Sequence, residues 1–572
     1  MANGKWKTIN GKWVFIFVTL LLAAAAFRIS VAHWLPNDSP DDGRVYAQIA
    51  RNVLEQHVYS HDPEPPYNSS LIRLPGYPLF LASIYSVFGH GNNGAVRIIQ
   101  ALIDTATCAL IALLAFSWQP DEKKKRATAL AALALAAVCP FTTIYTATIL
   151  TEVLTNFLMV ALFIAATLAF RRLTTEDAEE NKATNFKQGI LWWCIAGLIG
   201  GIAVTMRPDS GLFLAAVGLT LVITGLGPLV LRFRKTPKIK DLRPKTKGVA
   251  RLLISGALFS MMFALVLTPW TIRNWRLFHV FQPLAPAHAE MPGEFVPRGY
   301  LLWVRSWLDD QKYVAQFLWP LEVEQIDVDD LPSQAFDSPE EKKQIAALFE
   351  KYNNPPDESE DAATNGSTPA EPSPSPTPTP SPSQPLQSKS TPAPSSDEKS
   401  DEQDESETST DQEQNDVEMT PEIDAGFMQV ARERIARHPF RHYVWLPIKR
   451  AKTMWFDTHS QYWPFEGELL PLDDLDYEVH QQFWLPLFAG LTAVYTLLGL
   501  AGAWVLWRAR KFAARPWLLL AALAIGLRLI LFSSLENPEP RYLVEFFPIL
   551  SALGGIALAQ IPVLRKPQTR TD

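Results

Sequence analysis

Two adjacent carboxylates open a short helical stretch near the start of the chain. Asp41 and Asp42 head the segment DDGRVYAQIARNVL, in which apolar residues recur at i, i+4 and i+8 from Val45. This spacing predicts an amphipathic helix along a membrane surface. One Asp suffices to cap the free N–H groups of such a helix, which leaves the other for work as a general base. Capping alone is the competing interpretation.

Glu152, in TATILTEVL, is a second acid at the end of an apolar run. We expect it on the same side of the membrane as Asp42. An acid there either reaches water or faces the bundle interior, where acids are usually functional. Because a helix N-terminus lowers the pKa of a nearby carboxyl, we expect Glu152 to orient an acceptor or to raise the basicity of Asp42.

Four arginines are also predicted at span ends on that side. A lone arginine there is typical of headgroup anchoring. Four together indicate a bound phosphate, because guanidinium groups grip phosphate oxygens through paired hydrogen bonds. They are Arg73, Arg207, Arg273 and Arg541. The three cysteines have no metal-type spacing, so no metal site is predicted.

These residues need a membrane scaffold to bring them together. The chain has 572 residues, 48% of them hydrophobic, and contains about ten apolar runs long enough to cross a bilayer. We therefore predict an all-α polytopic membrane protein with about ten transmembrane helices. The expected spans are 13–31, 94–118, 127–147, 151–170, 190–206, 210–231, 252–272, 483–507, 516–533 and 543–563. The shorter apolar stretch 75–89 is predicted to be re-entrant or interfacial.

Basic residues fix the expected topology. Lys and Arg cluster in alternate short loops, for example at 123–126, 232–247 and 508–515. Positive charge favours the cytoplasmic side, so both termini are predicted to be cytoplasmic, in a multi-pass protein of the cytoplasmic (inner) membrane. The candidate site then faces the periplasm or exterior. A cleaved signal peptide is the alternative for the first run.

The composition divides the chain into four parts. Residues 1–335 form a transmembrane catalytic module whose first exterior loop is 32–93. Residues 336–425 are an acidic, Pro/Ser-rich insert predicted to be disordered, and 426–482 are an exterior aromatic segment. Residues 483–572 hold the C-terminal spans. The Trp- and Tyr-rich stretches 300–319 and 438–465 predict juxtamembrane amphipathic helices on the outer surface.

The order of the motifs resembles a known superfamily. DDGRVYAQIARNVL, RLPGYPLF, TATILTEVL, MRPD, LTPWTIRNWRLF and ENPEPRYLVEF follow one another as in the GT-C polyprenyl-phosphate-dependent glycosyltransferases. The resemblance is to the bacterial branch of protein O-mannosyltransferases and the lipid A aminoarabinose transferase, and covers most of 10–335 and 430–563.

The resemblance implies roles for individual residues. Asp42 would be the catalytic carboxylate, with Asp41 as the alternate, and Glu152 the second acid. Arg73 and Arg541 would hold the carrier phosphate together with Tyr542. Tyr46, Pro75 and Tyr77 would position the site. It implies no certain cofactor and leaves a divalent metal open, although the acid that several relatives carry after the catalytic Asp is Gly43 here.

The predicted function is that of an inverting glycosyltransferase. It would move a sugar from a polyprenyl-phosphate carrier to a lipid, glycan or protein acceptor, in contact with membrane lipids and without nucleic acid. A transporter or flippase of lipid-linked saccharides is the alternative, although its charges belong at the membrane midplane. A polysaccharide polymerase or ligase and a simple membrane anchor are further readings.

Overall fold

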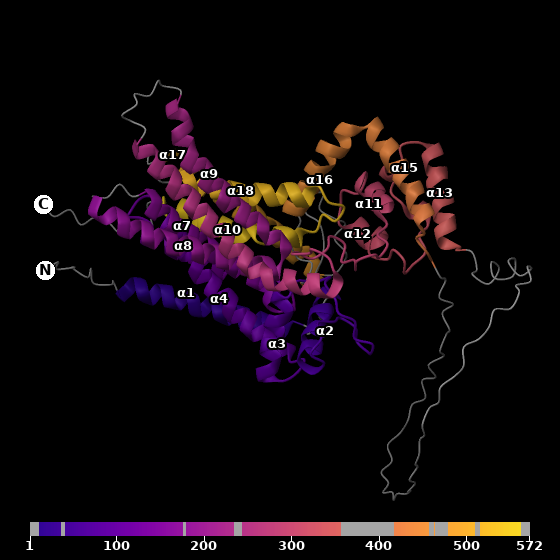
Figure 1. Cartoon of the computed structure of the whole chain (residues 1–572), viewed down its shortest axis with the longest axis horizontal. Coiled ribbons are helices and arrows are strands. Elements are labelled where there is room, and N and C mark those ends of the chain that lie inside the picture. Colours follow the sequence, from indigo (N-terminus) through magenta and orange to yellow (C-terminus); the bar gives the residue numbers. More distant parts are fainter. Residues whose placement is uncertain are drawn as a thin grey trace, which may run out of the picture.

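The structure is a computed structural model that describes residues 11–35, 41–174, 179–233, 243–355, 417–456, 463, 479–509 and 515–561. The described residues form helices joined by turns and loops, without strands. A long bundle occupies one part of the molecule and a smaller helical lobe lies beyond one end of it (Figure 1). The prediction of an all-α polytopic membrane protein is confirmed.

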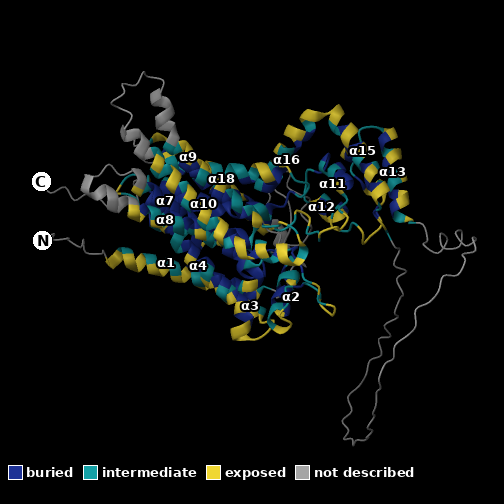
Figure 2. Ribbon diagram, in the orientation of Figure 1, coloured by how far each residue is buried: buried dark blue, intermediate teal, exposed yellow. Residues whose placement is uncertain are grey.

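Eight helices in the described residues are long and apolar enough to cross a membrane. They are α1 (Gly11–Trp34), α4 (Asn93–Trp118), α7 (Glu152–Thr174), α8 (Glu179–Met206), α9 (Gly211–Phe233), α10 (Arg243–Phe278), α17 (Val479–Arg508) and α18 (Arg515–Ser533). Helix α7 is the most deeply buried of them, whereas α1 and α10 leave most of their apolar surface exposed, as expected for helices that face lipid (Figure 2).

Two of the ten predicted spans differ from the expectation. The span 127–147 is broken into α5 (Lys125–Ala137), α6 (Pro140–Thr143) and η1 (Ile144–Thr146), with a bend of 56°. The span 543–563 is shorter than predicted, because the Pro-rich approach forms the turn η8 (Pro540–Leu543) and α19 (Phe546–Leu558) has only 13 residues. Helix α19 is buried along nearly its whole length, so surrounding helices rather than lipid cover it.

Two short helices lie at the same end of the bundle as the lobe (Figure 1). Helix α2 (Asp41–Glu55) has the predicted amphipathic character, with Ile49 and Ala50 buried and Arg51 exposed. Helix α3 (Gly76–Phe88) is apolar and too short to span a bilayer, as expected for 75–89. The segments predicted to be exterior therefore meet at one end of the molecule.

The lobe has its own aromatic core. It consists of α11 (Arg298–Arg305), α12 (Lys312–Phe317), η4 (Val328–Asp330), η5 (Ser333–Ala335), α13 (Pro339–Asn353) and α15 (Pro421–Arg437). Trp303, Phe349 and Phe427 are buried against one another there. The aromatic side chains of 300–319, expected along the membrane surface, pack largely inside the lobe.

Helices occupy both ends of the predicted insert 336–425. Ser338 caps α13 and Pro339 occupies its first turn, while Thr420 and Pro421 do the same for α15. The backbone N–H of Glu418 donates to the carbonyl of Tyr352 at 3.2 Å, so the two ends of the insert meet. Residues 356–416 lie outside the described residues.

The segment after α15 connects the lobe to the bundle. A π-helical turn, η6 (Arg441–Trp445), leads into α16 (Leu446–Phe456), and Phe440, Tyr443 and Trp445 are exposed there. The buried guanidinium of Arg450 donates to carbonyls of α11 and the residues after it, at Arg305 and Leu308. Most of the remaining predicted segment, up to 482, lies outside the described residues.

Candidate active site

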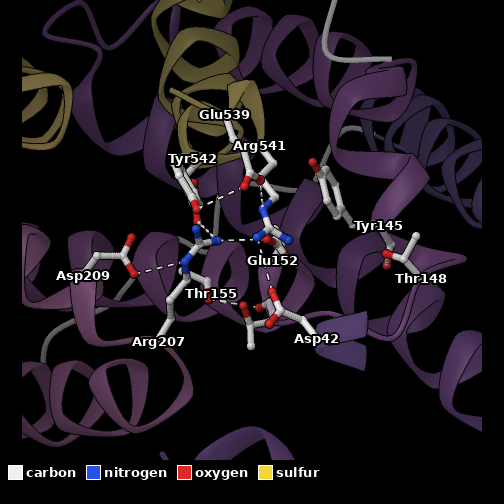
Figure 3. Close-up of polar contacts among 12 residues, drawn as sticks. Asp42, Tyr145, Thr148, Glu152, Thr155, Arg207, Asp209, Glu539, Arg541 and Tyr542 are labelled. Atoms are coloured by element: carbon white, nitrogen blue, oxygen red, sulfur yellow. Dashed lines mark hydrogen bonds and ion pairs between the residues drawn. The ribbon is translucent and has the colours of Figure 1, made fainter. Parts of the chain in front are cut away.

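The carboxylate of Asp42 lies between two arginines from distant parts of the chain. Its Oδ1 accepts a hydrogen bond from Nη2 of Arg73 at 2.8 Å, and its Oδ2 accepts one from Nη2 of Arg541 at 3.2 Å. Figure 3 shows Asp42 and Arg541 facing each other. The sequence prediction that these three residues share one site therefore agrees with their placement. The side chain of Asp41 lies outside the described residues.

The two arginines determine the protonation of Asp42. Burial raises the pKa of this carboxyl, but the positive charges of Arg541 and Arg73 outweigh burial and hold the pKa below its ordinary value of 3.8. Any effect of Glu152 on the basicity of Asp42 is smaller than that of the two arginines here. Asp42 is ionised at neutral pH and bound to cations, so it is a weak base in the state that the structure shows.

Arg541 and Arg73 are themselves held in place. The guanidinium of Arg541 pairs with the buried carboxylate of Glu539 and lies 5.4 Å from the ring centroid of Tyr542. Arg73 lies 5.9 Å from the ring centroid of Tyr46, and its carbonyl accepts from the hydroxyl of Tyr59 at 3.1 Å. Tyr46 and Tyr542 thus lie beside the arginines that the sequence assigned to phosphate.

The turn after Arg73 brings α3 against α8. A Cβ on Gly76 would lie 2.6 Å from backbone atoms of Thr205, so only glycine allows this approach. Pro75 precedes α3, and the buried hydroxyl of Tyr77 donates to Oε1 of Gln100 at 2.7 Å. Gln100 in turn donates to the carbonyl of Thr148 at 2.7 Å. The ring of Tyr77 also packs edge-on against that of Tyr46, with centroids 5.2 Å apart, so Tyr77 supports the residues beside Arg73.

Glu152 belongs to a second, deeper cluster. It begins α7 and its Oε1 accepts from Nη1 of Arg207 at 2.9 Å. Arg207 also pairs with Asp209 at 3.0 Å and with Glu545 at 3.4 Å. Its guanidinium lies 5.3 Å from the ring centroid of Tyr542, the ring that also lies under Arg541 (Figure 3). Three carboxylates therefore already surround Arg207.

Arg273 occupies a third place. Its guanidinium donates to the carbonyl of Ser70 at 2.9 Å and lies 4.7 Å from the ring centroid of Trp270 and 5.1 Å from that of Tyr59. It lines a cavity of about 410 Å³ whose other residues include Pro75, Gly76, Leu79, Thr205, Val266 and Trp270. The four predicted arginines are thus not one cluster: two bind Asp42, one binds Glu152 and one lines an apolar cavity.

One segment of the chain, which carries three of the site residues, matches a known protein family. Residues 73–236 match the family model described as dolichyl-phosphate-mannose-protein mannosyltransferase. This segment is similar to that family. The match confirms the resemblance predicted from the motifs over a segment that contains Arg73, Glu152 and Arg207, and it leaves Asp42 and Arg541 outside. No curated protein sequence matches the chain.

Solved structures with similarity to the chain are distant. The apo oligosaccharyltransferase of Archaeoglobus fulgidus has 13% identity and a TM-score of 0.45, with 96% of this chain and 50% of that chain covered. ArnT from Cupriavidus metallidurans bound to undecaprenyl phosphate has 14% identity and a TM-score of 0.34, covering 96% and 79%. The chain thus spans about half the length of the archaeal protein.

Four charged residues of the site escaped the sequence prediction: Asp209, Arg528, Glu539 and Glu545. Arg528 is fully buried in α18, where it pairs with Asp209 and with Glu545 and donates to the carbonyl of Tyr542 at 2.8 Å. It thereby ties together the starts of α9, α19 and η8. The available signal was a single arginine inside the apolar run LLLAALAIGLRLILF, because charges within spans mark functional or pairing sites.

Among the residues that the structure describes, no group of three or more His, Cys, Asp or Glu side chains is arranged to hold a metal ion. The carboxylates of the two clusters face guanidinium groups instead. What the site offers chemically is a carboxylate, two arginines that share it, and an apolar cavity beside Arg73.

Proposed function

We propose that the chain is an inverting glycosyltransferase that moves a sugar from a polyprenyl-phosphate carrier to an acceptor. The observation that carries the proposal is the placement of Asp42 between Arg73 and Arg541. A carboxylate and two phosphate-binding cations are the groups that this transfer requires. The family that residues 73–236 match is named for a donor of this kind, dolichyl-phosphate-mannose.

The donor fits the site in two parts. The phosphate would bind Arg73 and Arg541, whose guanidinium groups are mostly buried and suited to phosphate oxygens. The apolar cavity lined by Trp270 and Val266 would take the first part of the carrier chain. It begins next to Arg73, since Pro75 and Tyr59 line it, and α10, which contributes Trp270, is largely exposed along its apolar stretch.

The transfer then needs one proton movement and one displacement. Asp42 would take the proton from an acceptor O–H or N–H as the acceptor oxygen or nitrogen attacks the anomeric carbon. The bond from that carbon to the phosphate oxygen breaks, and the oxygen keeps the electron pair. Arg73 and Arg541 would stabilise the charge that develops on the phosphate. A single displacement inverts the anomeric centre.

Glu152 and Arg207 would support the acceptor side. Glu152 is buried, and its Oε2 has no hydrogen-bond partner in the structure, whereas Oε1 binds Arg207. This free oxygen is suited to an acceptor or sugar hydroxyl. We place the reaction at the exterior face of the cytoplasmic membrane, because the basic loops lie at the other ends of the spans.

The product's configuration tests the proposal. The purified chain in liposomes would receive polyprenyl-phosphate sugars of known anomeric configuration, with nucleotide sugars as the control donors. We expect transfer only from the lipid-linked donor, with a product of opposite configuration seen by NMR. Transfer from the nucleotide sugar or retention of configuration would contradict the proposal.

A further inference from the structure

The carboxylate of Asp42 occupies the two guanidinium groups that the proposed function assigns to the donor phosphate. One oxygen pairs with Arg73 at 2.8 Å and the other with Arg541 at 3.2 Å. Two oxygens of a phosphate would bridge the same pair of cations in the same way. The inference below therefore rests on the proposed function.

The geometry leaves unused donor capacity at Arg73. Its Nε is buried and has no hydrogen-bond partner, and its Nη1 donates a long hydrogen bond of 3.5 Å to the carbonyl of Ile72. A planar carboxylate that already serves two arginines cannot satisfy this third N–H. The tetrahedral phosphate is larger and has its oxygens directed differently, so it is better suited to the pair.

Asp42 can leave the arginines at little cost. Its side chain is 31% exposed, so water is available to it. It is also the second residue of α2, where the free N–H groups and the positive end of the helix dipole favour a carboxylate. The side chains of Arg73 and Arg541 are 25% and 15% exposed, and a partly buried cation needs an anion beside it. Arg541 keeps Glu539 as a partner when Asp42 leaves, so Arg73 is the cation that the incoming phosphate must neutralise.

We propose that Asp42 is a placeholder for the donor phosphate: it occupies Arg73 and Arg541 in the donor-free protein, and the incoming phosphate displaces it. Displacement moves the carboxylate from the two cations and makes it available to the acceptor. The base is therefore released only once the donor is bound. Binding is ordered, with donor before acceptor, and a donor-free site does not activate an acceptor.

Charge supports this order. In the donor-free site the arginines outweigh burial and keep the pKa of Asp42 low. A phosphate that neutralises the two arginines removes the charges that lower this pKa, so the pKa rises toward its ordinary value. The same exchange thus frees the base and strengthens it.

The experiment measures binding of undecaprenyl phosphate to the full chain in lipid nanodiscs. If Asp42 competes with phosphate, Asp42→Asn removes the competitor and tightens binding by roughly three- to thirty-fold. Glu55→Gln is the matched control, because it removes an exposed acid from the far end of the same helix. It should leave the affinity unchanged, and Arg541→Ala should weaken it.

The outcomes separate the placeholder from the proposed function. Suppose that the wild type binds undecaprenyl phosphate and that Arg541→Ala weakens this binding. If Asp42→Asn then binds no more tightly than the wild type, the placeholder role is overturned and the proposed function stands. An equal gain from Asp42→Asn in an Arg73→Ala background would show a general charge effect and also overturn it. No binding by wild type would overturn both.

Discussion

Replacement of Arg28 by Met should destabilise the bundle. Arg28 lies in α1 with no exposed surface, and its Nε pairs with the buried Asp104 at 2.6 Å. Its other nitrogens donate to the carbonyls of Ala136 and Ala137 at 3.0 and 3.1 Å. Proline at 140 has no N–H to give to the carbonyl of Ala136. That carbonyl accepts from the backbone N–H of Cys139 at 3.4 Å instead, and Arg28 adds a second donor to it at the break of the third span.

The magnitude follows from these contacts. An unpaired carboxylate within a span costs about 3 kcal/mol. The buried carbonyl of Ala137, which loses the Arg28 donor, costs about 1–3 kcal/mol more. Arg28→Met should therefore cost at least about 4 kcal/mol. The double variant Arg28→Met/Asp104→Leu removes the lone charge and should recover about 3 kcal/mol of that loss.

The assay uses the two cysteines beside this pair. Cys108 and Cys139 are buried and line the same small cavity as Arg28. Their reaction with a thiol dye during heating in detergent reports opening of this region. Exposed Arg432→Met, on α15, is the control for loss of one arginine. We expect the cysteines of Arg28→Met to react with the dye at a lower temperature than those of Arg432→Met. Equal reaction temperatures, or a double variant less stable than Arg28→Met, would refute the structural role of Arg28.

Three further predictions concern the site and the lobe. In the pH profile of kcat/KM, the acid limb that belongs to Asp42 should lie below the ordinary pKa of 3.8, because Arg541 and Arg73 outweigh burial and lower the pKa in the free enzyme. In the profile of kcat the limb should lie higher, because phosphate has then displaced Asp42, and coincident limbs in the two profiles would contradict this. Gly76→Ala should lower transfer at least about tenfold, because a methyl group forces α3 away from α8. Gly218→Ala, where the added methyl meets nothing within 4 Å, should keep wild-type transfer, and equal activities of the two variants would refute the account of the PGYP turn. Replacement of 357–415 by a short Gly/Ser linker should leave the melting temperature of the chain within a few degrees, because Tyr352 and Glu418 already close the lobe; loss of the folded lobe would show that the insert contributes to it.

The sequence predicted those helices whose formation depends on residues close together in the chain. Apolar run length predicted most spans, and the periodicity of 41–55 predicted α2. The failures lie where long-range packing decides. The aromatic residues of 300–319 look interfacial from composition, yet Trp303 and Trp307 pack within the lobe because α13 and α15 cover them. A proline at 140 broke a span that hydropathy alone reads as continuous.

The sequence predicted several residues of the candidate site but not which charged side chains pair with one another. The motifs selected Asp42, Arg73 and Arg541, and the structure brings these together. That Arg207 binds Glu152 rather than joining them depends on how α7, α8 and α19 pack, which no single motif contains. Arg528 was missed because it stands alone in an apolar run, whereas its partners Asp209 and Glu545 come from two distant segments.

The central claim is that Asp42 and the arginine pair together transfer a sugar from a lipid carrier. The most direct test is transfer of radiolabelled sugar from polyprenyl-phosphate donors in membranes with wild type, Asp42→Asn, Arg541→Ala and Glu55→Gln at matched expression. The account predicts labelled product from wild type and Glu55→Gln, and a loss of about 100-fold or more in the other two. Full labelling by Asp42→Asn and Arg541→Ala would contradict it.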